Sequence, residues 1–296
     1  MSSADTADQA PAFDNPLTPF GVGDLGREGL VGTLVGQLGP RLADHRGRID
    51  LPVFAVLFDH VGGFPFFLAQ EDGASTLQSR LSMSLLADVA VTERLTGRAE
   101  VRTDDGTYGV STVDLRTAAG RLCVTGTARS VRVGRGGEDT DMDSLAAPSA
   151  AGEGCLPEPI DPELSGRDIV DAIAAGALDP GPIVRLLDGR IEEGRFVVRT
   201  APWMGNHFGT MHGGLIATIV AQGISLAAQA HTAPGVDYRV ADLSVGFYRS
   251  PAVDGGEVIV EVEPVKVGRR IGSFDAVLRT RDGLLLSKAV ADVIFR

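Results

Sequence analysis

The sequence has few of the residues on which several common protein classes depend. Its 296 residues include only two cysteines, Cys123 and Cys155, which excludes a disulfide scaffold and a thiolate zinc cluster. No apolar run reaches the roughly 18 residues of a membrane span, and the N-terminus lacks the basic and apolar segments of a secretory signal. The formal net charge is −12, which disfavours binding to nucleic acid. We therefore expect a cytoplasmic protein that binds neither membranes nor nucleic acids.

Two stretches rich in small and polar residues divide the chain. Residues 1–20 are typical of a mobile tail, and residues 134–165 form an acidic segment with almost no large apolar side chains. We interpret the second stretch as a linker. The sequence thus predicts an N-terminal domain over 21–133 and a C-terminal domain over 166–296.

The two predicted domains resemble each other. The segment His60-Val61-Gly62-Gly63 resembles Met211-His212-Gly213-Gly214, and Leu115-Arg116-Thr117 with the following Ala-Ala-Gly resembles Leu278-Arg279-Thr280 with Arg-Asp-Gly. The first pair is separated by 151 residues and the second by 163. Two similarities in the same order favour an internal duplication over chance.

Each half is predicted to contain one helix followed by four strands. In the second half, apolar residues at helical spacing begin at Leu215 and are accompanied by small residues, which predicts a helix buried on most sides. The predicted strands of that half are 240–250, 257–265, 271–280 and 284–295; for the first half we predict a helix over 63–70 and strands over 76–91, 97–103, 108–117 and 121–133. This order favours an α+β architecture in which an antiparallel sheet wraps a helix.

The segment Asn206-His207-Phe208-Gly209-Thr210-Met211-His212-Gly213-Gly214 carries the clearest chemical signal. Two glycines at a helix start leave unpaired N–H groups at the positive end of the helix dipole. Such groups can hold a carbonyl oxygen as it becomes an oxyanion. The alternative is a helix entry in which the glycines serve geometry alone and His212 is a cap.

The pattern N-x-x-G-x-x-H-G-G, followed by a helix of small residues, resembles the hotdog-fold acyl-CoA thioesterases of the PaaI type. The run from Ala241 to Pro251 is similar to that family's strand after the helix. The resemblance is strong over about 185–296 and weaker over about 50–133. It implies a double hotdog, with two sheet-wrapped helices in one chain, an acyl-CoA substrate and no cofactor other than the CoA of that substrate.

The resemblance also implies roles for individual residues. Gly213 would supply the oxyanion N–H, with Asn206 and His212 beside it. The family then needs a carboxylate nine residues past the histidine and often has a polar residue on the next strand, but those positions hold Ala221 and Val240.

The missing carboxylate is expected from the other half of the chain, because each site of the family combines both units. Counting from Gly62 leads to Gln70, Glu71 and Asp72, of which Glu71 is the preferred candidate. The alternative for these residues is a solvated helix end before a turn. The mirror-image site, built from Gly62 and Ala221, is expected to be inactive.

Basic residues suggest a handle for the phosphates of CoA. Lys266, Arg269 and Arg270 lie at one predicted turn, and Arg249 ends the preceding strand, although a solvated hairpin would have the same composition. Five aromatic residues could line an acyl tunnel or belong to the core: Phe64, Phe66, Phe67, Phe208 and Trp203. No metal site is expected, because His207 and His212 have no carboxylate cluster beside them.

We therefore expect an acyl-CoA thioesterase that releases CoA and a carboxylic acid. Two alternatives stay open: a non-catalytic acyl-CoA-binding or regulatory protein, and an enoyl-thioester hydratase with a catalytic histidine and acid. A tandem chain of this kind can also form a homodimer.

Overall fold

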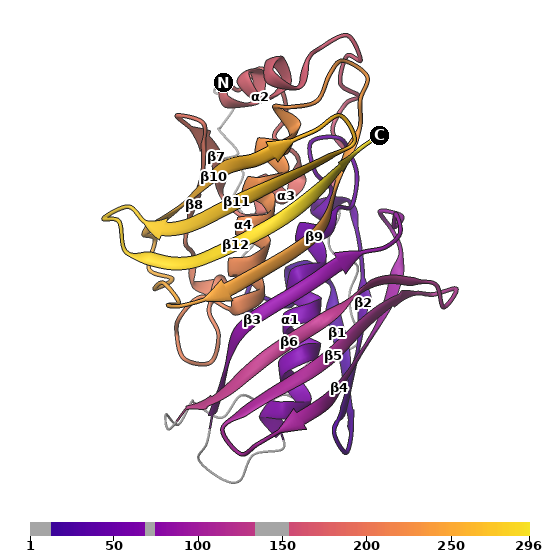
Figure 1. Cartoon of the computed structure of the whole chain (residues 1–296), viewed down its shortest axis with the longest axis vertical. Helices are drawn as coiled ribbons and strands as arrows, with labels where there is room; N and C mark the ends of the chain where they lie inside the picture. Colours follow the sequence, from indigo (N-terminus) through magenta and orange to yellow (C-terminus); the bar gives the residue numbers. More distant parts are fainter. Residues whose placement is uncertain (1–12, 69–74, 134–153) are drawn as a thin grey trace, which may run out of the picture.

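The two halves of the chain share one continuous antiparallel sheet. The computed structural model describes residues 13–68, 75–133 and 154–296, and within them twelve strands pair in the order β1-β2-β4-β5-β6-β3-β9-β12-β11-β10-β8-β7. This order is symmetric about the β3–β9 pair, so each strand of the first half has a counterpart in the second (Figure 1). The symmetry confirms the predicted duplication and the α+β double hotdog fold.

The element boundaries repeat closely between the halves. The first half contains β1 (Val22–Glu28), β2 (Val31–Gln37), α1 (Leu51–Leu68), β3 (Ser75–Leu85), β4 (Arg94–Asp104), β5 (Tyr108–Thr117) and β6 (Leu122–Val133). The second contains α2 (Gly166–Ala174), α3 (Pro182–Leu186), β7 (Gly189–Glu192), β8 (Arg195–Arg199), α4 (Gly213–Gln229), β9 (Tyr238–Phe247), β10 (Glu257–Val267), β11 (Ile271–Thr280) and β12 (Leu285–Phe295). The sequence predicted β5 and β11 with these boundaries and the other long strands to within three residues, except that the strand predicted over 76–91 extends six residues beyond the end of β3.

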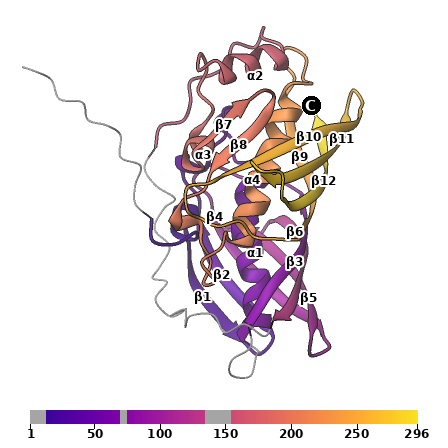
Figure 2. The ribbon, with the colours of Figure 1, turned by 90° about the vertical axis from the view of Figure 1, so that its left-hand side faces the viewer.

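Both long helices lie against the inner face of the curved sheet, α1 under the strands of the first half and α4 under those of the second (Figures 1 and 2). Nearly every residue of α4 is buried, as its apolar and small composition predicts. None of the helices in the described part of the chain is long and apolar enough to span a membrane.

The two helices touch each other at their N-terminal halves and run in opposite directions there. A Cβ atom on Gly214 would lie 2.6 Å from Cα of Val56, so only glycine allows this approach. One turn further along α4, the hydroxyl of Thr218 donates a 2.9 Å hydrogen bond to the carbonyl of Pro52. The start of α4 is therefore held directly against the middle of α1.

The first helix differs from its prediction. The expected helix over 63–70 began at the Gly62-Gly63 pair, whereas α1 begins at Leu51 and contains both glycines. These glycines serve packing: a Cβ on Gly62 would lie 2.6 Å from Cβ of Ala128, and one on Gly63 would lie 2.6 Å from the Gln78 amide nitrogen. The dipeptide thus recurs in both halves for different reasons, and the predicted alignment of Gly62 with Gly213 is wrong.

The predicted N-terminal tail is also too long, because Leu17 and Phe20 are buried in the hydrophobic core. The sequence did not predict β1, β2, β7 or β8; β1, β2 and β7 contain glycines, and β8 has only five residues, so each gives a weak strand signal. β6 ends at Val133 and α2 begins at Gly166, next to the boundaries predicted for the linker.

Candidate active site

The segment before α4 is a compact loop organised by Asn206. The side-chain carbonyl Oδ1 of Asn206 accepts hydrogen bonds from the backbone N–H groups of Phe208 at 2.9 Å and Thr210 at 3.3 Å. Gly209 adopts a positive φ of 71°, which favours glycine. The loop ends at His212, the N-cap of α4, whose Nδ1 accepts from the N–H of Gly214 at 3.1 Å. Asn206 therefore shapes the loop that presents the helix start.

The first half contains the same loop at residues 44–50. Oδ1 of Asp44 accepts from the N–H groups of Arg46 at 2.8 Å and Arg48 at 3.1 Å, and Gly47 has a φ of 73°. The pattern D-x-x-G-x-x-D thus matches N-x-x-G-x-x-H at an offset of 162 residues, close to the 163 of the Leu-Arg-Thr segments. The counterpart of His212 is therefore Asp50, which precedes α1 and whose side chain bonds the N–H of Leu51.

This register identifies a carboxylate that the sequence reading missed. Nine residues past Asp50 lies Asp59, the counterpart of Ala221. Asp59 projects from α1 toward the start of α4, where its Oδ2 accepts a 2.7 Å hydrogen bond from the N–H of Gly214 and lies 3.3 Å from Nδ1 of His212. A carboxylate from the first half and a helix start from the second half thus meet at one place.

Burial sets the protonation states in this cluster. It raises the pKa of Asp59 to about 7, against the smaller opposing effect of the Gly214 hydrogen bond. It lowers the pKa of His212 to about 3, assisted by the nearby His60 and His207, and the pKa of His60 to about 4. At neutral pH both imidazoles are uncharged, while Asp59 occurs in both protonation states, as suits a group that takes up and releases a proton.

The N–H of Gly213 is available to a ligand. Among the described residues it has no hydrogen-bond partner, and as the first residue of α4 it has none within the helix. Gly213 is partly exposed, whereas the Asp59 side chain is 4% exposed. A Cβ atom on Gly213 would lie 3.1 Å from Oδ2 of Asp59. Gly213 and the Asp59 carboxylate therefore lie side by side, and Gly213 is the more exposed of the two.

The predicted carboxylate candidates Gln70, Glu71 and Asp72 lie outside the described residues. Asp59 precedes them by more than two helical turns, because the sequence alignment took Gly62 rather than Leu51 as the counterpart of Gly213. The predicted combination of the two halves is what the structure shows for Asp59 and Gly214.

The mirror-image position has a different composition. It contains Ala221 in place of the carboxylate, and the two residues that correspond to Gly213 and Gly214 are Leu51, whose N–H already donates to Asp50, and Pro52, which has no N–H. Arg46 lies 3.1 Å from Oδ2 of Asp50 and stacks over the Tyr238 ring at 3.7 Å. This position therefore offers neither a free helix amide nor an unpaired carboxylate.

Aromatic and imidazole rings lie near the cluster of Asp59, His212 and Gly213, which we call the composite site because both halves contribute to it. His60 and His212 lie with ring centroids 6.0 Å apart, and His60 stacks on Phe64. Toward the end of α1, Phe67 lies 5.5 Å from His207, whose Nε2 is 3.1 Å from the Ser75 hydroxyl.

The other candidate tunnel residues are placed differently. Phe208 lies beside His207, Phe66 is buried under Arg132, and Trp203 packs against Phe13. Among the predicted aromatic residues, Phe64, Phe67 and Phe208 are therefore the ones linked by ring contacts to histidines of the site.

The four basic residues that were predicted to bind the phosphates of CoA lie at two opposite ends of the second half. Arg249 is exposed and close to the loop before α4, since the Pro251 carbonyl accepts a 2.9 Å hydrogen bond from the N–H of Met211. Lys266, Arg269 and Arg270 belong to the β10–β11 hairpin. The Arg270 carbonyl accepts from Phe295, which pairs with Tyr238 at the start of β9. Because β9 follows the C-terminal end of α4, this hairpin lies at the opposite end of α4 from Gly213. A helix of 17 residues is about 25 Å long. The structure therefore brings only Arg249 near the composite site.

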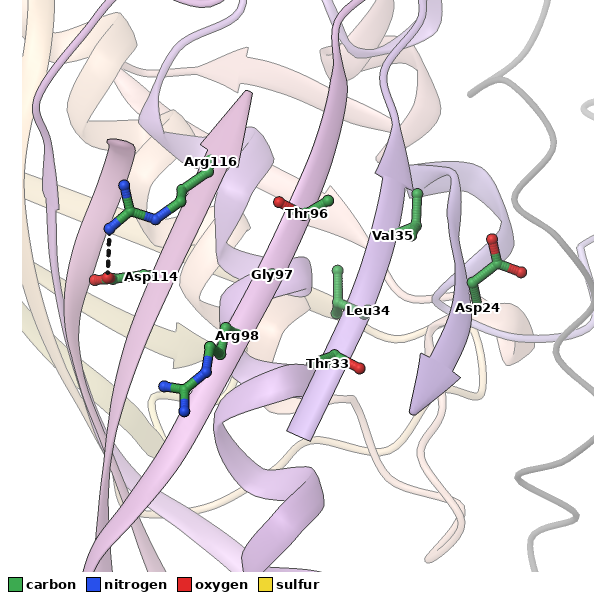
Figure 3. A pocket seen from close by; sticks show the side chains of 9 residues that line it. All are labelled: Asp24, Thr33, Leu34, Val35, Thr96, Gly97, Arg98, Asp114 and Arg116. Atoms are coloured by element: carbon green, nitrogen blue, oxygen red, sulfur yellow. Dashed lines mark hydrogen bonds and ion pairs between the residues drawn. The ribbon is translucent and has the colours of Figure 1, made fainter. Parts of the chain in front are cut away.

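A hollow of about 480 Å³ lies elsewhere, on strands β1, β2, β4 and β5 (Figure 3). Its lining includes the charged residues Asp24, Arg98, Asp114 and Arg116, and Arg116 is ion-paired with Asp114. None of the residues around Asp59 and Gly213 lines it. Among the described residues, no group of three or more His, Cys, Asp or Glu side chains could hold a metal ion.

Comparison with known proteins agrees with the double hotdog fold. The model of the thioesterase superfamily matches residues 208–287. A solved thioesterase from Novosphingobium aromaticivorans, described as putative, is 14% identical, with 92% of this chain and 98% of that chain covered and a TM-score of 0.58. A tesB protein from Mycobacterium avium subspecies paratuberculosis is 11% identical, with 95% and 97% covered and a TM-score of 0.55.

An acyl-ACP thioesterase from Bacteroides thetaiotaomicron is 14% identical, with 90% of this chain and 98% of that chain covered and a TM-score of 0.54. No curated protein matches the chain. These similarities extend over both halves, which agrees with the tandem architecture. The chain is thus a double hotdog protein, and residues 208–287 of its second half match the thioesterase superfamily model.

Proposed function

We propose that this protein is a thioesterase that hydrolyses an acyl thioester, such as an acyl-CoA, at a single composite site of the PaaI type. The observation that carries the proposal is the meeting of Asp59, from the first half, with the start of α4, from the second. The superfamily match supports thioester chemistry. The N-x-x-G-x-x-H-G-G pattern supports the PaaI type.

In the proposed reaction, the N–H of Gly213 binds the carbonyl oxygen of the thioester and stabilises the negative charge that develops there. Asp59 acts as general base: it takes a proton from a water molecule, whose oxygen attacks the carbonyl carbon. The C–S bond then breaks, and the departing thiolate takes up the proton that Asp59 removed from the water, which restores the ionised carboxylate. The products are a free carboxylic acid and a thiol, which is CoA when the substrate is an acyl-CoA.

The mirror-image position is proposed to be inactive, so that one chain has one reaction centre. Ala221 cannot accept a proton, and Pro52 cannot donate a hydrogen bond. Ala221 and Val240, which favoured a non-catalytic binding protein in the sequence, belong to this position. They therefore no longer count against catalysis at Asp59.

The oxyanion role of Gly213 can be tested by removing its N–H without removing the helix. Proline suits the first position of a helix, and His212, with φ of −60° and ψ of 137°, has a conformation that allows a following proline. Gly213→Ala is the matched control, since it adds a Cβ atom but keeps the N–H. With a panel of acyl-CoAs and a thiol reagent, we expect Gly213→Pro to have a kcat about 100-fold below that of Gly213→Ala. Equal rates for the two variants would exclude this role.

A second candidate function is hydration of an enoyl thioester. It is favoured by the 3.3 Å distance between His212 Nδ1 and Asp59 Oδ2, because such a reaction needs a histidine and an acid side by side. Loss of the enoyl absorbance in the ultraviolet, without release of thiol, would select this function. Thiol release from saturated acyl-CoAs would select the thioesterase.

A further inference from the structure

We propose that Gln78 is a positioning residue, which holds the turn of α1 that carries Asp59 against the N-terminal end of α4. Gln78 lies on β3, and its Nε2 donates a 3.0 Å hydrogen bond to the backbone carbonyl of Asp59. This inference rests on the proposed function, because it assigns to Gln78 the task of fixing the proposed general base.

The orientation of the Gln78 amide is determined by its two hydrogen-bond partners, the Asp59 carbonyl and the Ser130 hydroxyl. The two residues are register partners on β3 and β6, and the buried Ser130 hydroxyl donates to Oε1 of Gln78 at 3.1 Å. Because the Asp59 carbonyl can only accept, Nε2 must be the atom that faces α1, and Oε1 is left to accept from Ser130. The sheet thus aims a fixed donor at the helix backbone.

Gly63 provides the space for this contact. A Cβ atom at Gly63 would lie 2.6 Å from Nε2 of Gln78, so any other residue would push the amide away from Asp59. In a helix, the Asp59 carbonyl also faces the N–H of Gly63, and the Gln78 bond is an additional tie at the same turn. Such a tie matters here because Pro65 cannot donate to the carbonyl of Val61, which leaves the next turn with one helical bond fewer.

The comparison of the two halves separates this contact from ordinary fold packing. The counterpart of Gln78 on β9 is Val240, and the counterpart of Ser130 on β12 is Val293; Val240 and Val293 are again register partners. The second half therefore builds the same sheet with two apolar residues. The polar pair occurs only in the half whose helix carries the carboxylate, which points to Asp59 as the reason for it.

The consequence of the contact is geometric. Asp59 must keep its Oδ2 at the N–H of Gly214 while the neighbouring N–H of Gly213 holds the substrate, and a displacement of about 1 Å at a catalytic group can reduce the rate 100-fold. Gln78 acts on the backbone of Asp59, so it has no direct contact with the reacting atoms. It should therefore affect kcat much more than KM.

The test uses the full chain with Gln78→Val, which introduces the residue of the second half, Gly63→Ala, and the two changes combined. Each single change is expected to reduce kcat by about 10-fold to 100-fold with KM unchanged. The combined variant should lose no more than the worse single one, because both changes remove the same contact. Ser79→Ala, which removes a neighbouring hydroxyl that bonds the Arg129 carbonyl, is the matched control and should leave kcat unchanged.

A pH–rate profile distinguishes positioning from a loss of folded protein. The Gly214 hydrogen bond lowers the pKa of Asp59, so loosening it should move the ascending limb of the profile to higher pH. Gln78→Met, which keeps the length of the side chain but has no donor for the Asp59 carbonyl, should show the same shift if Gln78→Val folds poorly.

A folded Gln78 variant with the wild-type kcat and profile would overturn the inference, as would losses that multiply in the combined variant. Asp59→Asn is measured alongside. If that change leaves activity intact, the proposed function fails; if it abolishes activity while the Gln78 variants are unaffected, only the positioning role fails.

Discussion

Replacing Asp59 by asparagine is expected to abolish hydrolysis and, at the same time, to stabilise the protein. The substitution preserves the shape of the side chain and an oxygen that can accept from Gly214, but it removes the group that takes a proton from water. Loss of a general base typically reduces a rate by about 10² to 10⁴. The opposite effects on activity and stability have the same origin, which is the burial of a carboxylate.

The expected stabilisation follows from the pKa of Asp59. Burial raises this pKa from 3.8 to about 7, so the folded state binds the proton more tightly than the unfolded state. The contribution of Asp59 to the free energy of unfolding is therefore greatest below pH 3.8 and is lost as the pH rises to about 7. With one pH unit equal to about 1.4 kcal/mol, the ionised carboxylate costs the fold roughly 4 kcal/mol above pH 7.

Urea unfolding of wild type and Asp59→Asn at pH 5 and pH 8 measures this cost. The variant should gain about 3 kcal/mol relative to wild type between the two pH values, since most of the ionisation falls in that interval. His60 and His212 are present in both proteins, so their titration largely cancels. Asp275→Asn, at an exposed position of β11, should show no such gain. A stability difference that is the same at both pH values would refute the reasoning, and an active Asp59→Asn variant would refute the role.

Three further outcomes are expected. The rate of thiol release at low substrate concentration should rise about tenfold per pH unit below pH 7 and level off above it, because the ionised Asp59 is the base. A rate that is the same from pH 5 to pH 8 in a stopped assay would contradict this. Ala221→Asp should not create a second site, because Pro52 offers no amide there, and it should not restore thiol release in the Asp59→Asn background. Arg249→Ala should raise the KM for an acyl-CoA several-fold while Lys266→Ala does not, because of these two residues only Arg249 lies near the loop before α4. A larger KM effect of Lys266→Ala in steady-state kinetics would show that the substrate lies along the other end of α4.

Much of the fold was predictable because long strands with regular alternation carry a strong local signal. β5 and β11 have the predicted boundaries, and their Leu-Arg-Thr ends were recognised as copies. The second helix was predictable from its apolar and small residues. The short strands β7 and β8 were missed because four or five residues contain too little periodicity to be distinguished from a loop.

The site was predicted in part, and the error has a definite cause. The sequence predicted that the start of α4 combines with a carboxylate from the first half; the structure places Asp59 beside Gly214, and a catalytic role for this pair stays a prediction. The sequence did not identify Asp59, because two glycine pairs with different packing roles were aligned with each other. The signal that could have found Asp59 was present as Asp44-x-x-Gly47-x-x-Asp50, with an acidic residue nine positions later. Aspartate in place of both asparagine and histidine concealed the match.

Pro52, the counterpart of Gly214, and Ala221, the counterpart of Asp59, have a consequence for how the chain can be divided. A symmetric pair of C-terminal halves would have two helix starts like that of α4 and no carboxylate to act as a base. A symmetric pair of N-terminal halves would have two such carboxylates and no helix start with a free N–H. Separately produced halves should therefore be active only as a mixed pair, and the covalent connection between them guarantees a one-to-one ratio. In this molecule, duplication has ended in complementary halves that depend on each other.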